Sequence, residues 1–137
     1  MPLFHSVICA IAKNEGKYLV EWCAHHAAIS IEHIYLYDND SDDETEALLS
    51  APGMQRFVTR ISWPSVPNEK PQFTAYNHWL ENFSENAKWV AVIDLDEFIN
   101  IKSHACINDF LNFRDGEQVG AIGINWRIFG SSNQKIY

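Results

Sequence analysis

Residues 89–98 read WVAVIDLDEF, an apolar run of five residues that passes directly into three carboxylates. A short apolar run of this kind is typical of a β-strand buried on both faces. Side chains alternate along an extended chain, so Asp94 and Asp96 should project to the same side while Leu95 points back. Two neighbouring carboxylates disfavour each other's ionisation unless a cation lies between them. A divalent cation with oxygen ligands would meet that need, so the stretch predicts a metal-assisted site.

Apolar strands alternate with amphipathic helices along the rest of the chain. A pairing of Ser41 with Glu44 matches a capping box and predicts the start of the second helix. The alternation predicts one α/β domain, residues 1–137, with a mostly parallel sheet flanked by helices. The pattern predicts strands at residues 6–12, 33–37, 56–62, 89–93 and 119–126, and helices at about 16–29, 42–50, 72–85 and 105–113.

Three of the predicted strands end in polar turns that carry carboxylates. These turns are Asn14-Glu15, residues 38–43 and residues 94–97. Ligands of parallel sheets bind beyond the carboxyl ends of the strands, so we expect the three turns to meet at one crevice. Asp38 lies directly at a strand tip and is the strongest candidate of its acidic run. Its neighbours suit a helix N-terminus, and the run lacks the glycine and glutamate positions of a calcium-binding EF-hand.

Composition excludes several classes of protein. The net charge is -8 and there is no Lys/Arg cluster, which argues against a nucleic-acid partner. The three cysteines are far apart, so they predict reduced, cytosolic thiols rather than a zinc site or a disulfide framework. No apolar run reaches the roughly 18–20 residues that a membrane span needs, and no signal peptide is evident. We therefore expect a cytoplasmic protein without a transmembrane segment.

Two histidines, one glutamine and one tryptophan each allow more than one interpretation. His26 falls on the apolar face of the first predicted helix and is expected to be a core histidine. The adjacent His25 points in another direction and could approach the site, although a position away from it is the simpler interpretation. Gln72 on the third predicted helix could reach a sugar, although a polar side chain that only faces solvent is the simpler interpretation. Trp126 is either a core residue or a platform on which a sugar ring stacks.

Several of these stretches together resemble a known family. The matching stretches are KNE at 13–15, EW at 21–22 with HH at 25–26, YDNDSDD at 37–43, and the run 89–98 that ends in DLDEF. In this order they resemble glycosyltransferase family 2-like proteins, in the branch related to glycosyltransferase family 92. The likeness covers most of the chain.

The resemblance implies a GT-A fold, which is a Rossmann-like sheet flanked by helices, together with a nucleotide diphosphate sugar donor and Mn²⁺ or Mg²⁺. It implies that Asn14 and Glu15 border the nucleoside and that Asp38 contacts the base. Asp94 would hold the ribose or a metal-bound water, and Asp96 would ligate the metal.

The resemblance also bears on the length of the chain. Such proteins usually continue well past residues 129–132, so we expect a truncated GT-A-type domain whose acceptor-binding part and general base lie elsewhere. The expected function is transfer of a sugar from a nucleotide diphosphate sugar to a hydroxyl acceptor, such as a glycan or a lipid-linked sugar. One alternative is a non-catalytic nucleotide-sugar-binding module. Another is a phosphatase like the haloacid dehalogenases, in which the first aspartate of a D-x-D pair is a nucleophile.

Overall fold

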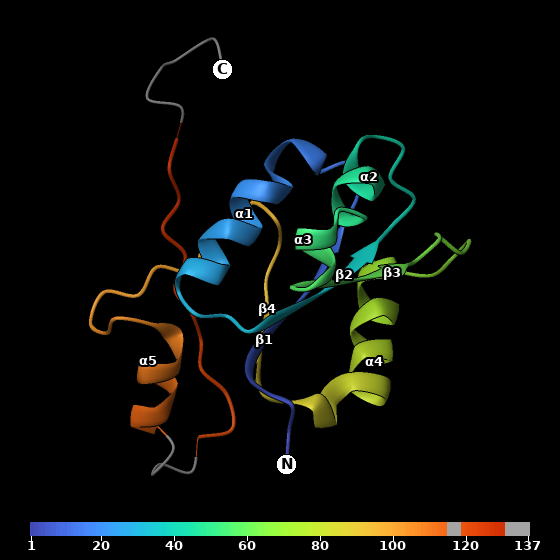
Figure 1. Ribbon diagram of the computed structural model, residues 1–137. Coiled ribbons are helices and arrows are strands. Elements are labelled where there is room, and N and C mark those ends of the chain that lie inside the picture. The colour runs from blue at the N-terminus through green and yellow to red at the C-terminus, as the bar shows by residue number, and fades with distance from the viewer. Residues whose placement is uncertain (115–118, 131–137) are drawn as a thin grey trace.

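The computed structural model describes residues 1–114 and 119–130. The described residues form a four-stranded, all-parallel sheet in the order β3-β2-β1-β4 (Figure 1). Helices connect the strands, so the predicted α/β architecture is confirmed. The strands are β1 (Phe4–Ala12), β2 (His33–Asp38), β3 (Val58–Ser62) and β4 (Ala87–Val92), and the helices are α1 (Gly16–Ala28), α2 (Thr45–Leu49), α3 (Pro52–Gln55), α4 (Pro71–Phe83), the 3₁₀ turn η1 (Ser84–Asn86) and α5 (Ile107–Arg114).

Helices cover both faces of the sheet, which gives two cores. Alternate side chains of β1 enter different cores: Ile8 packs with residues of α1, α2 and α5, whereas Cys9 packs with residues of α4. Figure 1 shows the same arrangement, with α1 and α5 on one side of the sheet and α4 on the other. The two central strands are buried on both faces, which explains their nearly continuous apolar sequences.

The register brings the carboxyl ends of three strands to the same end of the sheet. Ala12, the last residue of β1, pairs with Asp38 at the end of β2. On the other side of β1, Cys9 pairs with Val92 at the end of β4. The amide of Asn39 also donates to the carbonyl of Ala12 at 2.8 Å, which continues the pairing past β2. The three polar turns therefore lie at the same end of the parallel sheet.

The prediction that residues 89–93 form a strand buried on both faces is wrong. β4 pairs with β1 and forms one edge of the sheet. Its burial is only partial, and Val92 keeps 51% of its surface exposed. A short apolar run does not reveal whether its strand lies in the centre or at the edge of a sheet, because both positions favour the same residues.

The predicted strand at 119–126 is wrong. In the part of the chain that the structure describes, residues 119–130 contain neither a helix nor a paired strand. Ile124 and Trp126 are 56% and 79% exposed. Gly120 and Gly123 interrupt the segment, and glycine weakens a strand because it has no side chain to pack. The periodic apolar residues therefore do not suffice to add this segment to the sheet.

The capping box is also wrong, and one short helix was not expected. α2 begins at Thr45, and the amide of this residue donates to the carboxylate of Asp43 at 3.0 Å. The Ser41 hydroxyl instead accepts the amide of Asn14 at 3.0 Å and lies four positions before the first residue of α2. Pro52 opens this unexpected helix, α3, as its first residue, a position where proline's missing N–H costs nothing.

Candidate functional site

The carboxylates of residues 94–97 lie in a closed turn immediately after β4. The amide of Glu97 donates to the carbonyl of Asp94 at 3.1 Å. In return, the Glu97 carboxylate accepts the amide of Asp94 at 3.0 Å. Asp94 and Asp96 are exposed, whereas Leu95 between them is 3% exposed and joins the core. The exposure of the two aspartates and the burial of Leu95 agree with the predicted alternation, although the residues form a turn rather than a strand.

The charges of this turn have no cationic partner among the described residues. Partial burial raises the pKa of Asp94, and the neighbouring charges of Glu97 and Asp96 raise it further. Among residues that the structure describes, no Lys or Arg forms an ion pair with any of the three carboxylates. The turn therefore concentrates negative charge that an external cation would relieve.

The donor set suits a hard divalent cation that brings further ligands with its substrate. Carboxylate oxygens are the side-chain ligands that Mg²⁺ and Mn²⁺ prefer. Within residues 1–114 and 119–130, no three His, Cys, Asp or Glu side chains are grouped so that they could hold an ion. Mg²⁺ sites of phosphate-handling proteins often have only one or two carboxylates, and substrate phosphates complete them. Asp94 and Asp96 match that pattern.

A cavity of about 570 Å³ opens beside the turn. The 94–97 turn forms one wall, and residues 124–129 form the other. Trp126, Ile128 and Phe129 of that second wall are 79%, 85% and 81% exposed. The cavity thus combines a carboxylate wall with a wall of exposed apolar and aromatic side chains that also includes the polar Asn125 and the cationic Arg127. Asn14, Glu15 and Asp38 lie outside it. The expectation that the three acidic turns meet at one crevice is therefore wrong for this cavity, although the turns lie at the same end of the sheet.

Helix α4 adds two polar groups beside Asp94. The side-chain amide of Gln72 lies 3.4 Å from an oxygen of Asp94 and 3.1 Å from the hydroxyl of Tyr76. The two residues are four positions apart and thus lie on one face of the helix. The sequence identified Gln72 as a candidate but gave no signal for Tyr76, because an aromatic residue at helical spacing is usually packed inside.

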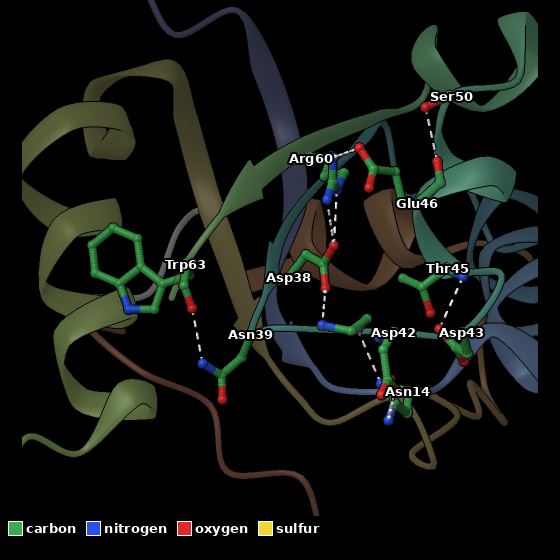
Figure 2. A network of polar contacts seen from close by, with 11 residues as sticks. Asn14, Asp38, Asn39, Asp42, Asp43, Thr45, Glu46, Ser50, Arg60 and Trp63 are labelled. Atoms are coloured by element: carbon green, nitrogen blue, oxygen red, sulfur yellow. Dashed lines mark hydrogen bonds and ion pairs between the residues drawn. The ribbon is translucent and has the colours of Figure 1, made fainter. Parts of the chain in front are cut away.

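Asp38 lies in a different environment at the tip of β2 (Figure 2). Its side chain is 2% exposed, and one of its oxygens contacts two nitrogens of Arg60, at 2.7 Å and 2.9 Å. Its other oxygen accepts the amide of Ser41 at 3.2 Å. Arg60 also contacts Glu46 at 2.8 Å. The charge of Asp38 is thus balanced inside the protein, by a residue of β3 that no motif indicated.

Asn14 fastens the turn after β1 to the turn after β2. Its side-chain amide donates to the Asp42 carboxylate at 2.7 Å, and its side-chain oxygen accepts the Asp42 amide at 2.9 Å. Asn14 has a φ of 58°, a left-handed conformation that asparagine tolerates better than most residues. The next residue, Glu15, precedes α1 without a side-chain cap bond. The nucleoside contacts of Asn14, Glu15 and Asp38 stay predictions.

Similarity to known proteins decides the family. The sequence pattern of glycosyltransferase family 92 matches residues 6–136, which include all three acidic turns. The chain belongs to glycosyltransferase family 92. The family 92 resemblance drawn from the KNE, EW, HH, YDNDSDD and DLDEF stretches is therefore confirmed.

Plant proteins of family 92 are similar over most of this chain. A family 92 protein from Oryza sativa subsp. japonica is 31% identical over 133 residues, which cover 95% of this chain and 22% of the relative. One from Ricinus communis is 28% identical over 131 residues, or 93% of this chain and 23% of the relative. One from Arabidopsis thaliana is 29% identical over 98 residues, or 71% of this chain and 16% of the relative.

Two further findings complete the comparison. The chain spans less than a quarter of the length of each of these family 92 relatives. No solved structure matches it. In addition, none of the helices in residues 1–114 and 119–130 has the length and apolar character needed to cross a bilayer.

Proposed function

We propose that this chain binds a nucleotide diphosphate sugar with Mn²⁺ or Mg²⁺ at the 94–97 turn and serves the transfer of the sugar to a hydroxyl acceptor. Membership of glycosyltransferase family 92 supports the class of reaction. The observation that carries the proposal is the group of three carboxylates at the carboxyl edge of the sheet. They have no cationic partner among the described residues, whereas the buried carboxylate of Asp38 has one.

Asp94 and Asp96 are the residues that would hold the ion. When bound, the ion would neutralise the diphosphate and stabilise the departing nucleotide. Glu97 keeps the turn closed through the Asp94 amide, so its carboxylate has a structural use already. Gln72 and the Tyr76 hydroxyl lie next to Asp94 and supply hydrogen-bond donors for ribose or phosphate oxygens.

The cavity beside the turn is suited to the sugar. Carboxylates accept hydrogen bonds from sugar hydroxyls, and an exposed indole such as that of Trp126 offers a flat surface for the apolar face of a sugar ring. The nucleoside would extend from the turn along the carboxyl end of the sheet towards Asn14 and Glu15, because the Asp38 carboxylate is buried and paired with Arg60. The general base is not assigned to a residue of this chain.

Thermal stabilisation by a panel of nucleoside diphosphates, with and without Mn²⁺, tests the proposal. We expect one or more of them to raise the Tm only when Mn²⁺ is present, because the ion joins the carboxylates to the diphosphate. Asp96→Asn should abolish the Mn²⁺-dependent part of the shift. Asp109→Asn, the same change at an exposed aspartate of α5, is the matched control and should keep it.

The outcomes separate the candidate functions. Equal Mn²⁺-dependent shifts in the wild type and Asp96→Asn would contradict the metal assignment. Stabilisation without hydrolysis or transfer of any donor sugar would favour the non-catalytic binding module. An aspartyl-phosphate trapped at Asp94 would favour the phosphatase alternative.

A further inference from the structure

We propose that Trp22, His25 and His26 of α1 are positioning residues, which fix the backbone of residues 97–99 and thereby aim the carboxylates of the 94–97 turn. The inference rests on the proposed function of that turn and adds to it a set of residues outside the site. It follows from hydrogen bonds between α1 and a segment more than 70 positions later in the sequence.

The first observation is that the sheet does not hold the turn. The ladder of β4 ends at Val92, so residues 94–99 receive no hydrogen bonds from a neighbouring strand. Glu97 connects the turn to the residues that follow it. Its amide closes the turn on the Asp94 carbonyl, and its carboxylate accepts the Asp94 amide. Any displacement of Glu97 is therefore passed to Asp94.

The second observation is that α1 makes hydrogen bonds and ring contacts to residues 97–99. The indole N–H of Trp22 donates to the Glu97 carbonyl at 2.8 Å. The Nε2 atom of His25 lies 2.9 Å from the Ile99 carbonyl, to which it must donate, since a carbonyl oxygen only accepts. The His25 ring also meets the Phe98 ring edge-on, with 5.1 Å between centroids. Three consecutive residues are thus in contact with one helix.

The third observation is that the partners of His26 fix its tautomer. Its Nδ1 atom lies 2.9 Å from the Trp22 carbonyl and must carry the proton. Its Nε2 atom then faces the Ile99 amide, 3.4 Å away, as an acceptor. His26 is fully buried, and burial lowers its pKa to about 4, so it is neutral and can fill both roles at neutral pH. It joins the backbone of α1 to that of Ile99.

These contacts do more than close the core, because they act on a segment whose exposed side chains are the candidate ligands. A purely apolar contact would bury Ile99 without fixing the rotation of its peptide groups. Directional bonds to two carbonyls and one amide do fix it. Metal sites depend on such supporting contacts, which hold the ligands in orientation.

His25 offers the sharpest test, because it is only partly buried and its replacement should not prevent folding. His25→Leu removes the donor and keeps a similar bulk, whereas His25→Gln keeps an N–H donor at a similar reach. The first readout is amide hydrogen exchange at Glu97 and Ile99. Loss of one hydrogen bond should speed this exchange about fivefold in His25→Leu, and His25→Gln should restore it. Amides of Ile8 and Leu36 in the sheet are the internal control.

The second readout is the Kd of Mn²⁺ in the presence of the nucleoside diphosphate that stabilises the wild type most. We expect His25→Leu to weaken Mn²⁺ binding about fivefold, and His25→Gln to restore it, since the lost bond orients the ligands. Rescue by the donor-bearing variant is an effect that a merely space-filling histidine would not produce.

The outcomes distinguish this inference from the proposed function. If the wild type binds Mn²⁺ with the nucleotide and His25→Leu binds the ion equally well, the positioning role is overturned and the proposed function stands. If the wild type binds no Mn²⁺, the proposed function fails. Unchanged exchange at Glu97 and Ile99 in His25→Leu would overturn the positioning role in either case.

Discussion

The tip of β2 and the turn after β4 both present aspartates at the carboxyl edge of the sheet, but their charges are balanced differently. Asp38 at the tip of β2 is buried and paired with Arg60, and the surrounding polar groups of Asn14, Ser41 and Asp42 bond to one another (Figure 2). The carboxylates of the 94–97 turn are held by backbone contacts, and no described Lys or Arg forms an ion pair with them.

The difference teaches how an acidic sequence motif is best interpreted. Both regions have closely spaced carboxylates after a strand, so the residues alone make both of them candidates. A carboxylate that is paired with a cation of the same protein has a structural role, because removing either partner leaves the charge of the other without its partner. A carboxylate with like charges nearby and no cation lowers stability, and such an arrangement is typical of functional sites. The comparison supports a structural role for Asp38 and the proposed ligand role of Asp94 and Asp96.

Asp38→Asn should have the largest effect on stability. It leaves Arg60 without its buried partner, so we expect the free energy of unfolding to fall by about 3 kcal/mol. Urea denaturation at pH 7 measures this change. Asp109→Asn, the exposed control on α5, should change the free energy by less than about 0.5 kcal/mol. Equal effects of the two substitutions would contradict the structural role of Asp38.

His26 provides a pH test of the contacts that hold the second region. Burial lowers its pKa from 6.5 to about 4, so between these values the unfolded chain binds a proton that the folded chain does not. The free energy of unfolding should therefore decrease as the pH falls from 6.5 towards 4, by up to about 1.4 kcal/mol for each pH unit. Urea denaturation at pH 7 and pH 5 measures the change. His26→Gln should have a shallower slope, and identical slopes would contradict the assignment.

Asp94→Asn should have a small effect of the opposite sign to that of Asp38→Asn. It removes one of three mutually repelling charges and keeps an oxygen that can accept from Gln72. Because solvent screens exposed charges, we expect a gain of only about 0.5 kcal/mol in the free energy of unfolding. Urea denaturation at low ionic strength is the suitable measurement. A clear loss of stability would mean that Asp94, like Asp38, has a structural partner.

Much of the fold was predictable from the sequence, because local patterns determine it. The apolar runs of β1 and β2 and the helical spacing of Leu19, Trp22 and Cys23 in α1 are such patterns, and the structure confirms them. The edge position of β4 was not predictable, since strand order depends on contacts between distant segments. The failure of residues 119–126 to join the sheet has the same origin.

The candidate site was predictable in its chemistry but not in its surroundings. The D-x-D spacing correctly indicated that Asp94 and Asp96 project outward and that Leu95 points inward. The partner of Asp38 could not be found in this way, because Arg60 is 22 residues away and belongs to no motif. The same holds for Trp22 and His26, whose bonds to residues 97–99 only the tertiary structure brings about.

The most direct test of the account is to locate Mn²⁺ in crystals of this chain grown with a nucleoside diphosphate, by anomalous diffraction at the manganese absorption edge. The account predicts one peak in contact with the carboxylates of Asp94 or Asp96 and with the diphosphate. A peak at the Asp42 and Asp43 carboxylates, or a bound diphosphate without any manganese at the 94–97 turn, would contradict it.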